Sequence, residues 1–407
     1  MTLNYRDLDW KLIAAVLALS LIGIALILSA RYHADTGSFE SYYLRQLLWL
    51  FVALFAFTAV IHIPLRYFDV GAYVIYGVAI ALLVLVLMIG SSKLGDARRF
   101  FSFGPINLAP SDIAKVAVVL ALGRYFAYTK KPVTSKRRMV LSALLAAIPA
   151  ILVLKQPDLG ASLVFLAVVF VLWFWSGLSV GYLFLVLSPL VSLVAASHWL
   201  SWALYFAVLL VIIWVVRPGA LMGLTTVVAN LAFGSITPFI WGRLADYQKA
   251  RILTFLDPGR DPRGGGYQVI QSKIAIGSGG VFGKGYLEGS QTRLDFLPER
   301  HTDFIFSVLG EEFGLIGSIV VLLLFGYIFY RAIKIAVRCR SRFASNVVMG
   351  ATAILFFQFL VNIGMTLGIM PVTGLALPFL SYGGTALVLA WTLIGFVVSA
   401  HYRWQDY

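Results

Sequence analysis

The chain has 407 residues, of which 60% are hydrophobic and only 12% are charged, and its mean hydropathy is +0.90. This composition excludes a water-soluble domain of such length and predicts a polytopic integral membrane protein. The formal net charge of +14 does not indicate a nucleic-acid partner, because the basic residues cluster between apolar segments, where they set topology and contact membrane lipids. The single cysteine, Cys339, excludes an intramolecular disulfide and a multi-cysteine metal site.

Apolar runs of spanning length follow one another along the chain and predict an all-α polytopic bundle of about twelve transmembrane helices. The first run is too long for the core of a signal peptide and is expected to span the membrane. Ten or eleven helices would also fit the hydropathy, because the runs between 179 and 242 are only weakly separated. The twelve runs are 11–30, 45–63, 70–90, 110–127, 138–154, 159–176, 179–197, 199–216, 219–242, 304–330, 345–369 and 384–400.

Two short loops carry basic residues and no acidic ones, and they predict the orientation. Loops 128–138 and 331–344 each hold several Lys or Arg side chains, which places both on the cytoplasmic side. Twelve helices with both termini in the cytoplasm satisfy this parity; ten would as well, and eleven would not. The polar segments that then lie on the outer face are 91–109, 155–158, 243–303 and 370–383.

The longest of these, 243–303, is expected to be a structured extracytoplasmic loop. Its charges nearly balance, and its many glycines predict turns and close backbone packing. A simple glycine-rich tether is the alternative, but interleaved apolar residues such as Ile270, Ile274 and Phe282 argue against it. An amphipathic helix lying on the membrane is predicted around 266–276.

Two outer segments place charges beside helix starts. Arg98 and Arg99 lie in the loop before the run 110–127, and Lys115 lies one turn into that run. Its ammonium must either reach the interface or meet an anion, and in the second case it would seat a phosphate-bearing headgroup. Asp158 follows Pro157 directly before a helix, so it is either the N-cap or a side chain that orients a cation across a cavity.

The segment 297–314, LPERHTDFIFSVLGEEFG, crowds six ionisable residues where an outer loop becomes a membrane helix. A charge at bilayer depth costs at least ~2.5 kcal/mol, so such a cluster must be paired, hydrated or used. Asp303 is either the helix N-cap or a general base, because a carboxylate at a partly dehydrated rim is more basic than one in water. His301 could do similar work.

Other charges near this segment are expected to serve structure or anion contact. Glu311 and Glu312 fall about 12 Å deeper than Asp303, at ~1.5 Å per residue, so they cannot act on the same atom. They are expected to pair with a buried cation such as Lys115 or to hold helices together. Lys273 is a further candidate for anion contact, with a solvated surface lysine as the alternative.

These charges lie at the outer ends of helices rather than at the midplane, which favours chemistry on a lipid-anchored headgroup over transport. The sequence contains no P-loop, no dinucleotide-binding glycine motif and no metal-spaced histidine pair. The sequence therefore predicts no definite cofactor. Outer carboxylates would permit a divalent cation, Mg²⁺ or Mn²⁺, but no ligand spacing requires one.

At these residues the sequence resembles the SEDS family (shape, elongation, division and sporulation). The resemblance runs through 267–314, recurs in KQPDLGAS at 155–162 and in NIGMTLGIMPVTGLALPFLSYGG at 362–384, and is looser in 93–120. The wording LPERHTDF is closer to the elongation branch than to the cell-division branch. The whole chain, 1–407, is thus expected to be one SEDS transmembrane domain.

The resemblance implies a peptidoglycan glycosyltransferase of the bacterial cytoplasmic membrane that serves cell elongation and rod shape. Its implied substrate is lipid II, its leaving group is undecaprenyl pyrophosphate, and its implied partner is a class B penicillin-binding protein, a transpeptidase. The site would face the outer side of the membrane, and the reaction would invert the anomeric carbon. The alternative function is a lipid II flippase, which would need a polar path across the membrane.

The resemblance also implies roles for single residues. Asp303 matches the essential acid of the family and is expected to be the catalytic base. Lys115 and Arg99 match a lysine and an arginine expected to stabilise the pyrophosphate, and Asp158 matches an acid expected to orient Lys115. The remaining residues expected to contact substrate are Arg98, Lys273 and His301.

Two departures from the family pattern stand out. Ala109-Pro110-Ser111-Asp112 replaces the usual Gln-Pro-Ser-Glu, which leaves the role of Asp112 open. The segment 178–245 contains two spanning helices beyond the ten of the family core. Because this segment is almost uncharged, we expect it to form a peripheral packing or partner surface.

Overall fold

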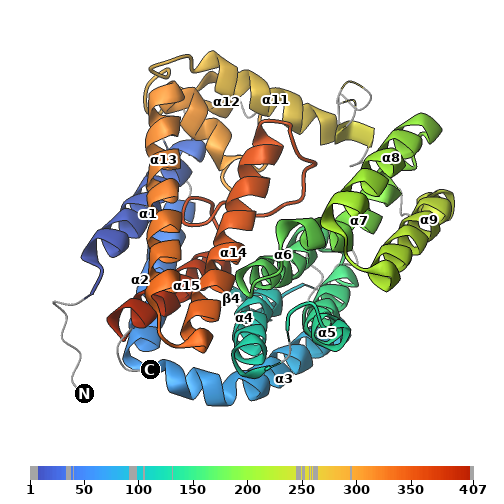
Figure 1. Ribbon diagram of the computed structural model, residues 1–407. Coiled ribbons are helices and arrows are strands. Elements are labelled where there is room, and N and C mark those ends of the chain that lie inside the picture. Colours follow the sequence, from blue (N-terminus) through green and yellow to red (C-terminus); the bar gives the residue numbers. More distant parts are fainter. Residues whose placement is uncertain are drawn as a thin grey trace.

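A computed structural model describes most of the chain and shows a helical bundle with two short hairpins (Figure 1). In the hairpins, β1 (Tyr32–His33) pairs with β2 (Ser38–Phe39), and β3 (Phe101–Phe103) pairs with β4 (Ile106–Leu108), both antiparallel. The residues described are 8–33, 38–39, 41–90, 99–103, 106–130, 132–243, 249, 253–255, 257, 259, 265–293 and 296–403.

Each of the twelve predicted apolar runs coincides with one helix of the bundle, which confirms the polytopic all-α fold. The largest differences are in two helices: α3 begins earlier than predicted, and α13 continues through basic residues that suit a helix C-terminus. The twelve helices are α1 (Trp10–Ala30), α2 (Tyr42–His62), α3 (Leu65–Ile89), α4 (Pro110–Tyr128), α5 (Lys136–Leu154), α6 (Leu159–Trp175), α7 (Val180–Ala195), α8 (Trp199–Val216), α9 (Ala220–Arg243), α13 (Ile305–Arg338), α14 (Arg342–Thr366) and α15 (Gly384–Tyr402).

Nine of these helices, within the part of the chain that the structure describes, are long and apolar enough to cross a membrane. Of the other three, α6 and α7 are apolar but have only 17 and 16 residues. Helix α4 has 19 residues but carries Asp112, Lys115 and Arg124. The count of twelve spans therefore stays a prediction for these three helices.

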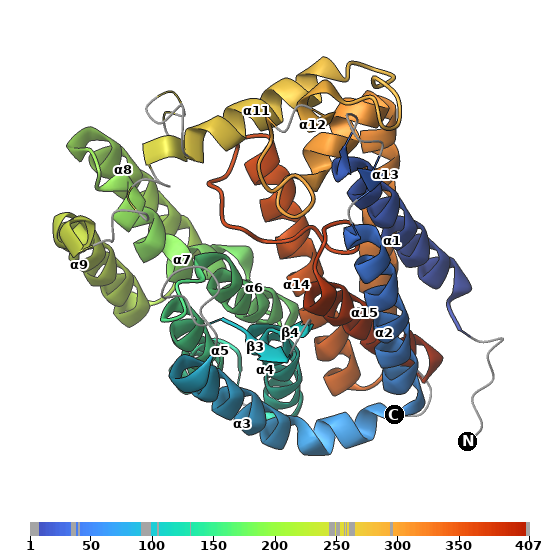
Figure 2. The same cartoon turned by 180° about the vertical axis from the view of Figure 1, so that it is seen from behind.

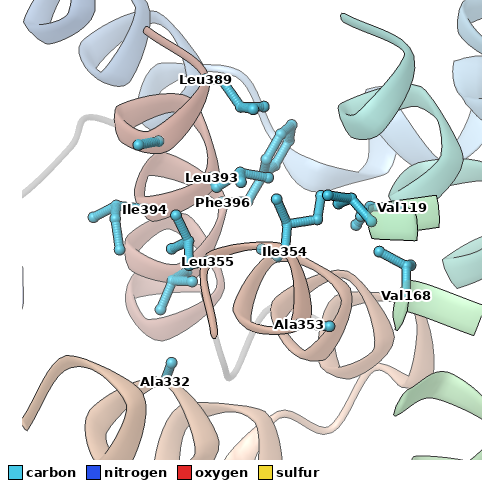
Figure 3. Close-up of a cluster of buried hydrophobic side chains, with 14 of the residues drawn as sticks. Val119, Val168, Ala332, Ala353, Ile354, Leu355, Leu389, Leu393, Ile394 and Phe396 are labelled. Carbon is cyan, nitrogen blue, oxygen red and sulfur yellow. The ribbon is translucent and has the colours of Figure 1, made fainter. Parts of the chain in front are cut away.

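The centre of the bundle is α14, which packs against α4, α6, α13 and α15. Figure 3 shows Ile354 and Leu355 of this helix among side chains of its neighbours, including Val119, Val168 and Leu393. The helices approach closely because small residues lie at the contacts. A Cβ added at Gly350 would come within 2.9 Å of Val119 Cγ1.

Helix α13 is interrupted at Gly314, whose φ of 61° and ψ of −155° are not helical. The glycine-rich segment 279–285 lies against the break and supplies the missing backbone hydrogen bonds. The amides of Leu315 and Ile316 donate to carbonyls of this segment at 3.0 and 3.2 Å, and the amide of Lys284 donates to the Glu311 carbonyl at 3.0 Å. A broken helix near a membrane is tolerated only when its backbone is satisfied in this way.

Close backbone packing explains the glycines of this segment. A Cβ added at Gly279 would lie 2.0 Å from the Gly310 carbonyl oxygen, and one at Gly283 would lie 2.1 Å from the Glu312 carbonyl oxygen. Neither position admits a side chain. The prediction of close packing is thus confirmed for the described part of segment 243–303, and the tether alternative is wrong there.

The predicted amphipathic helix is present as α11 (Gly265–Ser278), and a short helix, α12 (Ser290–Arg293), follows it. Both views show α11 lying across one end of the bundle (Figures 1 and 2). Ser272 fastens it there, because its hydroxyl lies 2.7 Å from Ser307 Oγ on α13 and donates to the Thr366 carbonyl at 2.6 Å.

Helices α7, α8 and α9 form a separate group at the edge of the bundle (Figures 1 and 2). Helix α7 packs chiefly on α8 and α9 and only slightly on α6. Polar side chains hold the group together: Asn230 Nδ2 donates to Ser188 Oγ at 2.7 Å, and the Tyr205 hydroxyl donates to Asn230 Oδ1 at 3.0 Å. The helices of segment 178–245 thus lie at the periphery, and whether two of them are additional to the family core stays a prediction.

Candidate functional site

Asp303 lies in a tight turn that leads into α13. The amides of Thr302, Asp303 and Phe304 all donate to the Glu299 carbonyl, at 3.2, 3.1 and 3.3 Å. Phe304 is the N-cap residue of α13, and no side chain caps the helix. Asp303 is therefore not the N-cap residue of α13, and its side chain is partly buried.

Helix α14 and the segment between α14 and α15 hold the Asp303 turn by hydrogen bonds. Asn362 Nδ2 donates to the Asp303 carbonyl at 2.9 Å and also to the Leu375 carbonyl at 2.8 Å. Ser381 Oγ donates to the Thr302 carbonyl at 2.6 Å, and the Tyr382 amide donates to the His301 carbonyl at 2.9 Å. Two motifs that are distant in sequence thus form one structural unit.

A third motif, at the start of α6, contacts the same unit. A Cβ added at Gly160 would lie 2.8 Å from the Thr373 carbonyl oxygen, so α6 begins directly against the segment between α14 and α15. A Cβ added at Gly374, where φ is +74°, would lie 3.6 Å from Asp303 Oδ2. The start of α6 and Asp303 are therefore separated only by the turn around Gly374.

Asp158 adopts the simpler of its two expected roles. Its Oδ1 accepts from the Ala161 amide at 3.0 Å, so it is the N-cap of α6. It makes no ion pair with Lys115, and the expectation that it orients that lysine does not match the structure. Arg99 holds the same turn, because its Nε donates to the Gln156 carbonyl at 2.9 Å. Arg98 lies outside the described residues.

Lys115 is buried, with 4% of its surface exposed, and pairs with Asp112 one turn earlier in α4. The Nζ–Oδ1 distance is 2.8 Å. A nearly buried ammonium requires an anion, and here the helix supplies one. The i, i+3 spacing of Asp112 and Lys115 is the sequence pattern that indicates this pair, although the two residues were not paired in the sequence analysis.

Glu311 does not pair with Lys115 as expected but with Lys284, at 2.8 Å. It is fully buried and also accepts from Ser290 Oγ at 3.1 Å and from the Gln291 amide at 2.9 Å. Glu312 accepts from the Ser29 hydroxyl of α1. These two carboxylates therefore tie the outer loop and α1 to α13, which is the arrangement of a structural role.

His301 is buried in a cluster of aromatic and basic residues that the sequence did not reveal. Its Nε2 lies 3.1 Å from Arg31 Nη2, and its ring centroid lies 5.1 Å from that of Tyr42 and 5.6 Å from that of Tyr382. Burial raises the pKa of Tyr382, against a lowering influence of Arg45, so the phenol stays neutral. The cluster anchors the Asp303 turn on the ends of α1 and α2.

Lys273 is exposed on α11 and lies against the end of α14. A Cβ added at Gly368 would come within 2.6 Å of its Nζ. Because Ser272 contacts Ser307, one turn after Asp303, the lysine lies at the same end of the bundle as the Asp303 turn. Among the described residues, no group of three His, Cys, Asp or Glu side chains could hold a metal ion.

Three buried polar atoms around this turn have no hydrogen-bond partner within the described parts of the chain: Gln156 Nε2, Asn362 Oδ1 and Thr373 Oγ1. A buried polar atom without a partner costs about 1–3 kcal/mol, so such atoms usually bind water or a polar ligand. Asn362 lies on α14, Thr373 lies in the segment that follows α14, and Gln156 precedes the start of α6. Together with the Asp303 carboxylate and with Lys273 at the same end of the bundle, these atoms suit a polar ligand that carries negative charge.

Comparison with known proteins gives a consistent result across nearly the whole chain. The cell cycle protein family of FtsW, RodA and SpoVE matches residues 9–205 and 190–405. The peptidoglycan glycosyltransferase MrdB of Escherichia coli K12 is 38% identical over 97% of this chain and 93% of its own. The peptidoglycan glycosyltransferase RodA of Treponema pallidum is 31% identical, with 98% of each chain covered.

Solved structures agree with this similarity. The rod shape determining protein RodA of Thermus thermophilus superposes with a TM-score of 0.65 and 27% identity, covering 99% of both chains. A chain from a peptidoglycan synthase complex, described as coordinating polymerization and crosslinking, superposes with a TM-score of 0.72 and 32% identity, covering 98% of this chain and 99% of its own.

Proposed function

This chain belongs to the SEDS family, the family of FtsW, RodA and SpoVE, and from this premise we propose that it polymerises lipid II into glycan strands during cell elongation. It is a multi-pass inner-membrane protein and a peptidoglycan glycosyltransferase. The observation that carries the assignment of the site is the Asp303 turn, held by Asn362 beside buried polar atoms that have no partner in the described structure.

In this reaction Asp303 is the general base. It takes the proton from the 4-hydroxyl of one lipid-linked disaccharide, whose oxygen attacks the anomeric carbon of the growing strand. The bond from that carbon to the pyrophosphate breaks, and undecaprenyl pyrophosphate leaves with inversion. The absence of a side chain at Gly374 keeps Asp303 Oδ2 approachable, since a Cβ there would lie 3.6 Å away.

Lys115 supplies positive charge for the leaving pyrophosphate. Before substrate binds, the ammonium pairs with Asp112 at 2.8 Å, and the substrate phosphates then replace or share that carboxylate. Arg99 and Asp158 shape the start of α6 through their contacts with the backbone, so they support the site by positioning. Lys273, His301 and Arg98 are proposed substrate contacts.

We place the Asp303 site on the extracytoplasmic side and both termini in the cytoplasm. The support is the excess of Lys and Arg in loops 128–138 and 331–344, at the other ends of α4 and α13. Single cysteines at Glu299 and at Arg338, in a Cys339→Ala background, test this orientation. A membrane-impermeant thiol reagent on intact spheroplasts should label the cysteine at 299 and spare the one at 338, and the reverse pattern would refute the assignment.

A class B penicillin-binding protein is the proposed partner. The superposed chain comes from a synthase complex that combines polymerization with crosslinking, two activities that this chain would share with a transpeptidase. A flippase would instead need charges that line a path across the membrane. The deep carboxylates Glu311 and Glu312 are engaged by Lys284 and Ser29, so they do not support that alternative.

The decisive experiment uses purified protein, lipid II and gel analysis of the glycan product, with and without the penicillin-binding partner. Asp303→Asn should abolish polymerisation while the protein still folds and binds its partner. Glu299→Gln is the matched control, because this exposed carboxylate belongs to the same turn and accepts a hydrogen bond from the Thr302 hydroxyl at 3.1 Å. Polymerisation by Asp303→Asn at the wild-type rate would refute the role of Asp303.

A further inference from the structure

A cavity of about 770 Å³ lies at the end of the bundle remote from Asp303. Helix α13 begins beside Asp303 and ends at Arg338 after 34 residues, about 50 Å at ~1.5 Å per residue. The cavity is enclosed by the last residues of α4, α6 and α13 and the first residues of α5 and α14. The two basic loops, 128–138 and 331–344, therefore meet around one concave space.

Four basic side chains line this cavity: Lys130, Arg138, Arg340 and Arg342. No Asp or Glu is among its described lining residues. Arg138 is buried in the wall, where its Nη2 donates to the Phe126 carbonyl at 3.1 Å, and it lies near enough to Arg342 for the two charges to repel each other. Like charges gathered around a hollow attract anions, and a bound anion relieves their repulsion.

The wall of the cavity is not only cationic. Val133, Trp175 and Val337 contribute apolar surface beside the basic groups. Trp175 is held in place by its Nε1, which donates to Ser345 Oγ at 3.0 Å. A free phosphate ion would use only the cations, whereas a phospholipid also places its glycerol and first acyl carbons against the apolar wall.

We propose that this cavity binds the phosphate headgroup of an anionic phospholipid from the adjoining leaflet. The positive charges of the two loops are needed for topology in any case, but topology depends on their number and not on a shared cavity. Arg338 shows the difference, because it lies in the same basic region and is exposed but does not line the cavity. The site is separate from Asp303 and does not depend on the proposed polymerisation.

Native mass spectrometry of the full-length detergent-solubilised protein, titrated with phosphatidylglycerol or phosphatidylethanolamine, tests the proposal. The double variant Arg340→Gln/Arg342→Gln should bind phosphatidylglycerol about 25-fold more weakly, or about fivefold for each charge. Arg338→Gln is the matched control and should bind as the wild type does. Arg340 and Arg342 are exposed, so their variants should retain the wild-type melting temperature.

Three outcomes would overturn the proposal. Equal losses in the double variant and in Arg338→Gln would show diffuse surface charge instead of a site. Equal affinity for phosphatidylethanolamine and phosphatidylglycerol would show that the headgroup charge is not recognised. Inorganic phosphate or glycerol 3-phosphate that displaces the lipid at concentrations similar to the lipid's own Kd would assign the cavity to a soluble phosphate.

Discussion

Helices α14 and α8 are both uninterrupted apolar helices, yet their surroundings differ completely. In α14, 72% of the most apolar stretch is buried within the protein, whereas in α8 only 6% is buried. The more buried helix is the less apolar of the two, because protein neighbours replace lipid around it and accept its polar side chains. Hydropathy thus locates a spanning helix but does not say whether lipid or protein surrounds it.

The polar residues of the two regions also connect differently. Asn362 of α14 reaches out of its helix to the Asp303 turn and to the segment after α14. Tyr205 of α8 bonds only within the group of α7, α8 and α9, to Ser188 and Asn230. The polar side chain of the central helix therefore holds the proposed site, whereas the polar side chains of the peripheral group join its own helices to one another. The following predictions test this contrast, from the largest effect to the smallest.

Removing the ammonium that pairs with Glu311 should be the most damaging change. Lys284→Met leaves a fully buried carboxylate without its cation, which should lower the free energy of unfolding by about 3 kcal/mol. Thermal unfolding followed by circular dichroism would measure this loss. Adding Glu311→Gln to the same variant should restore part of the stability, and a single variant as stable as the wild type would contradict the structural role of the pair.

Asn362→Ala should separate activity from stability. The change leaves two carbonyls without their donor, which should cost about 1–3 kcal/mol, and it releases the Asp303 turn, so glycan polymerisation should fall at least about tenfold. The control is Ser20→Ala, which leaves the buried Trp391 indole N–H without its acceptor, far along α1 from the site. Similar losses of polymerisation in both variants would show that Asn362 acts only through stability.

The corresponding change at the periphery is Asn230→Ala. It removes the hydrogen bonds of the Asn230 side chain to Ser188 of α7 and Tyr205 of α8, and bonds of this kind in membrane bundles are each worth about 0.6–2 kcal/mol. Stability should fall by about that amount, while polymerisation should stay at the wild-type rate. A loss of polymerisation in a folded Asn230→Ala protein would show that the peripheral group reaches the site.

The smallest change in stability is expected for a substitution on the exposed face of α8. Val211 is 59% exposed, so Val211→Ala should change the free energy of unfolding by no more than about 0.5 kcal/mol. The same substitution at the fully buried Val347 of α14 should cost about 2 kcal/mol. Equal costs at the two positions would mean that a partner or a second copy covers α8 in the tested sample.

The positions of the helices could be predicted because each membrane segment must satisfy its own backbone hydrogen bonds. That requirement is local, so the length of the apolar runs located all twelve helices of the bundle. The glycines of 279–285 predicted close backbone packing, although the sequence did not identify the segment that they pack against. The bounds were least accurate for α3, which begins before its predicted run, and for α13, which continues through polar residues after its apolar run has ended.

The pairing of charges could not be predicted in the same way. Glu311 was predicted to pair with a cation such as Lys115 or to hold helices together. The structure shows that the cation is Lys284, which lies beside the break at Gly314, whereas Lys115 pairs with Asp112. The contact between Asn362 and Asp303 spans 59 residues and depends on how α13 and α14 pack. The sequence of α13 or of α14 taken alone does not specify that these two residues meet.

The sequence alone predicted three things: a multi-pass helical membrane protein, the helix ends that carry charge, and Asp303 as the candidate base. The tertiary structure decided which of these charges meet, which residues hold the Asp303 turn, and that two basic loops enclose one cavity. The physical reason is that helix formation in a membrane depends on the composition of one segment. Contacts between side chains depend on the rotation and depth of several helices, which only their packing determines.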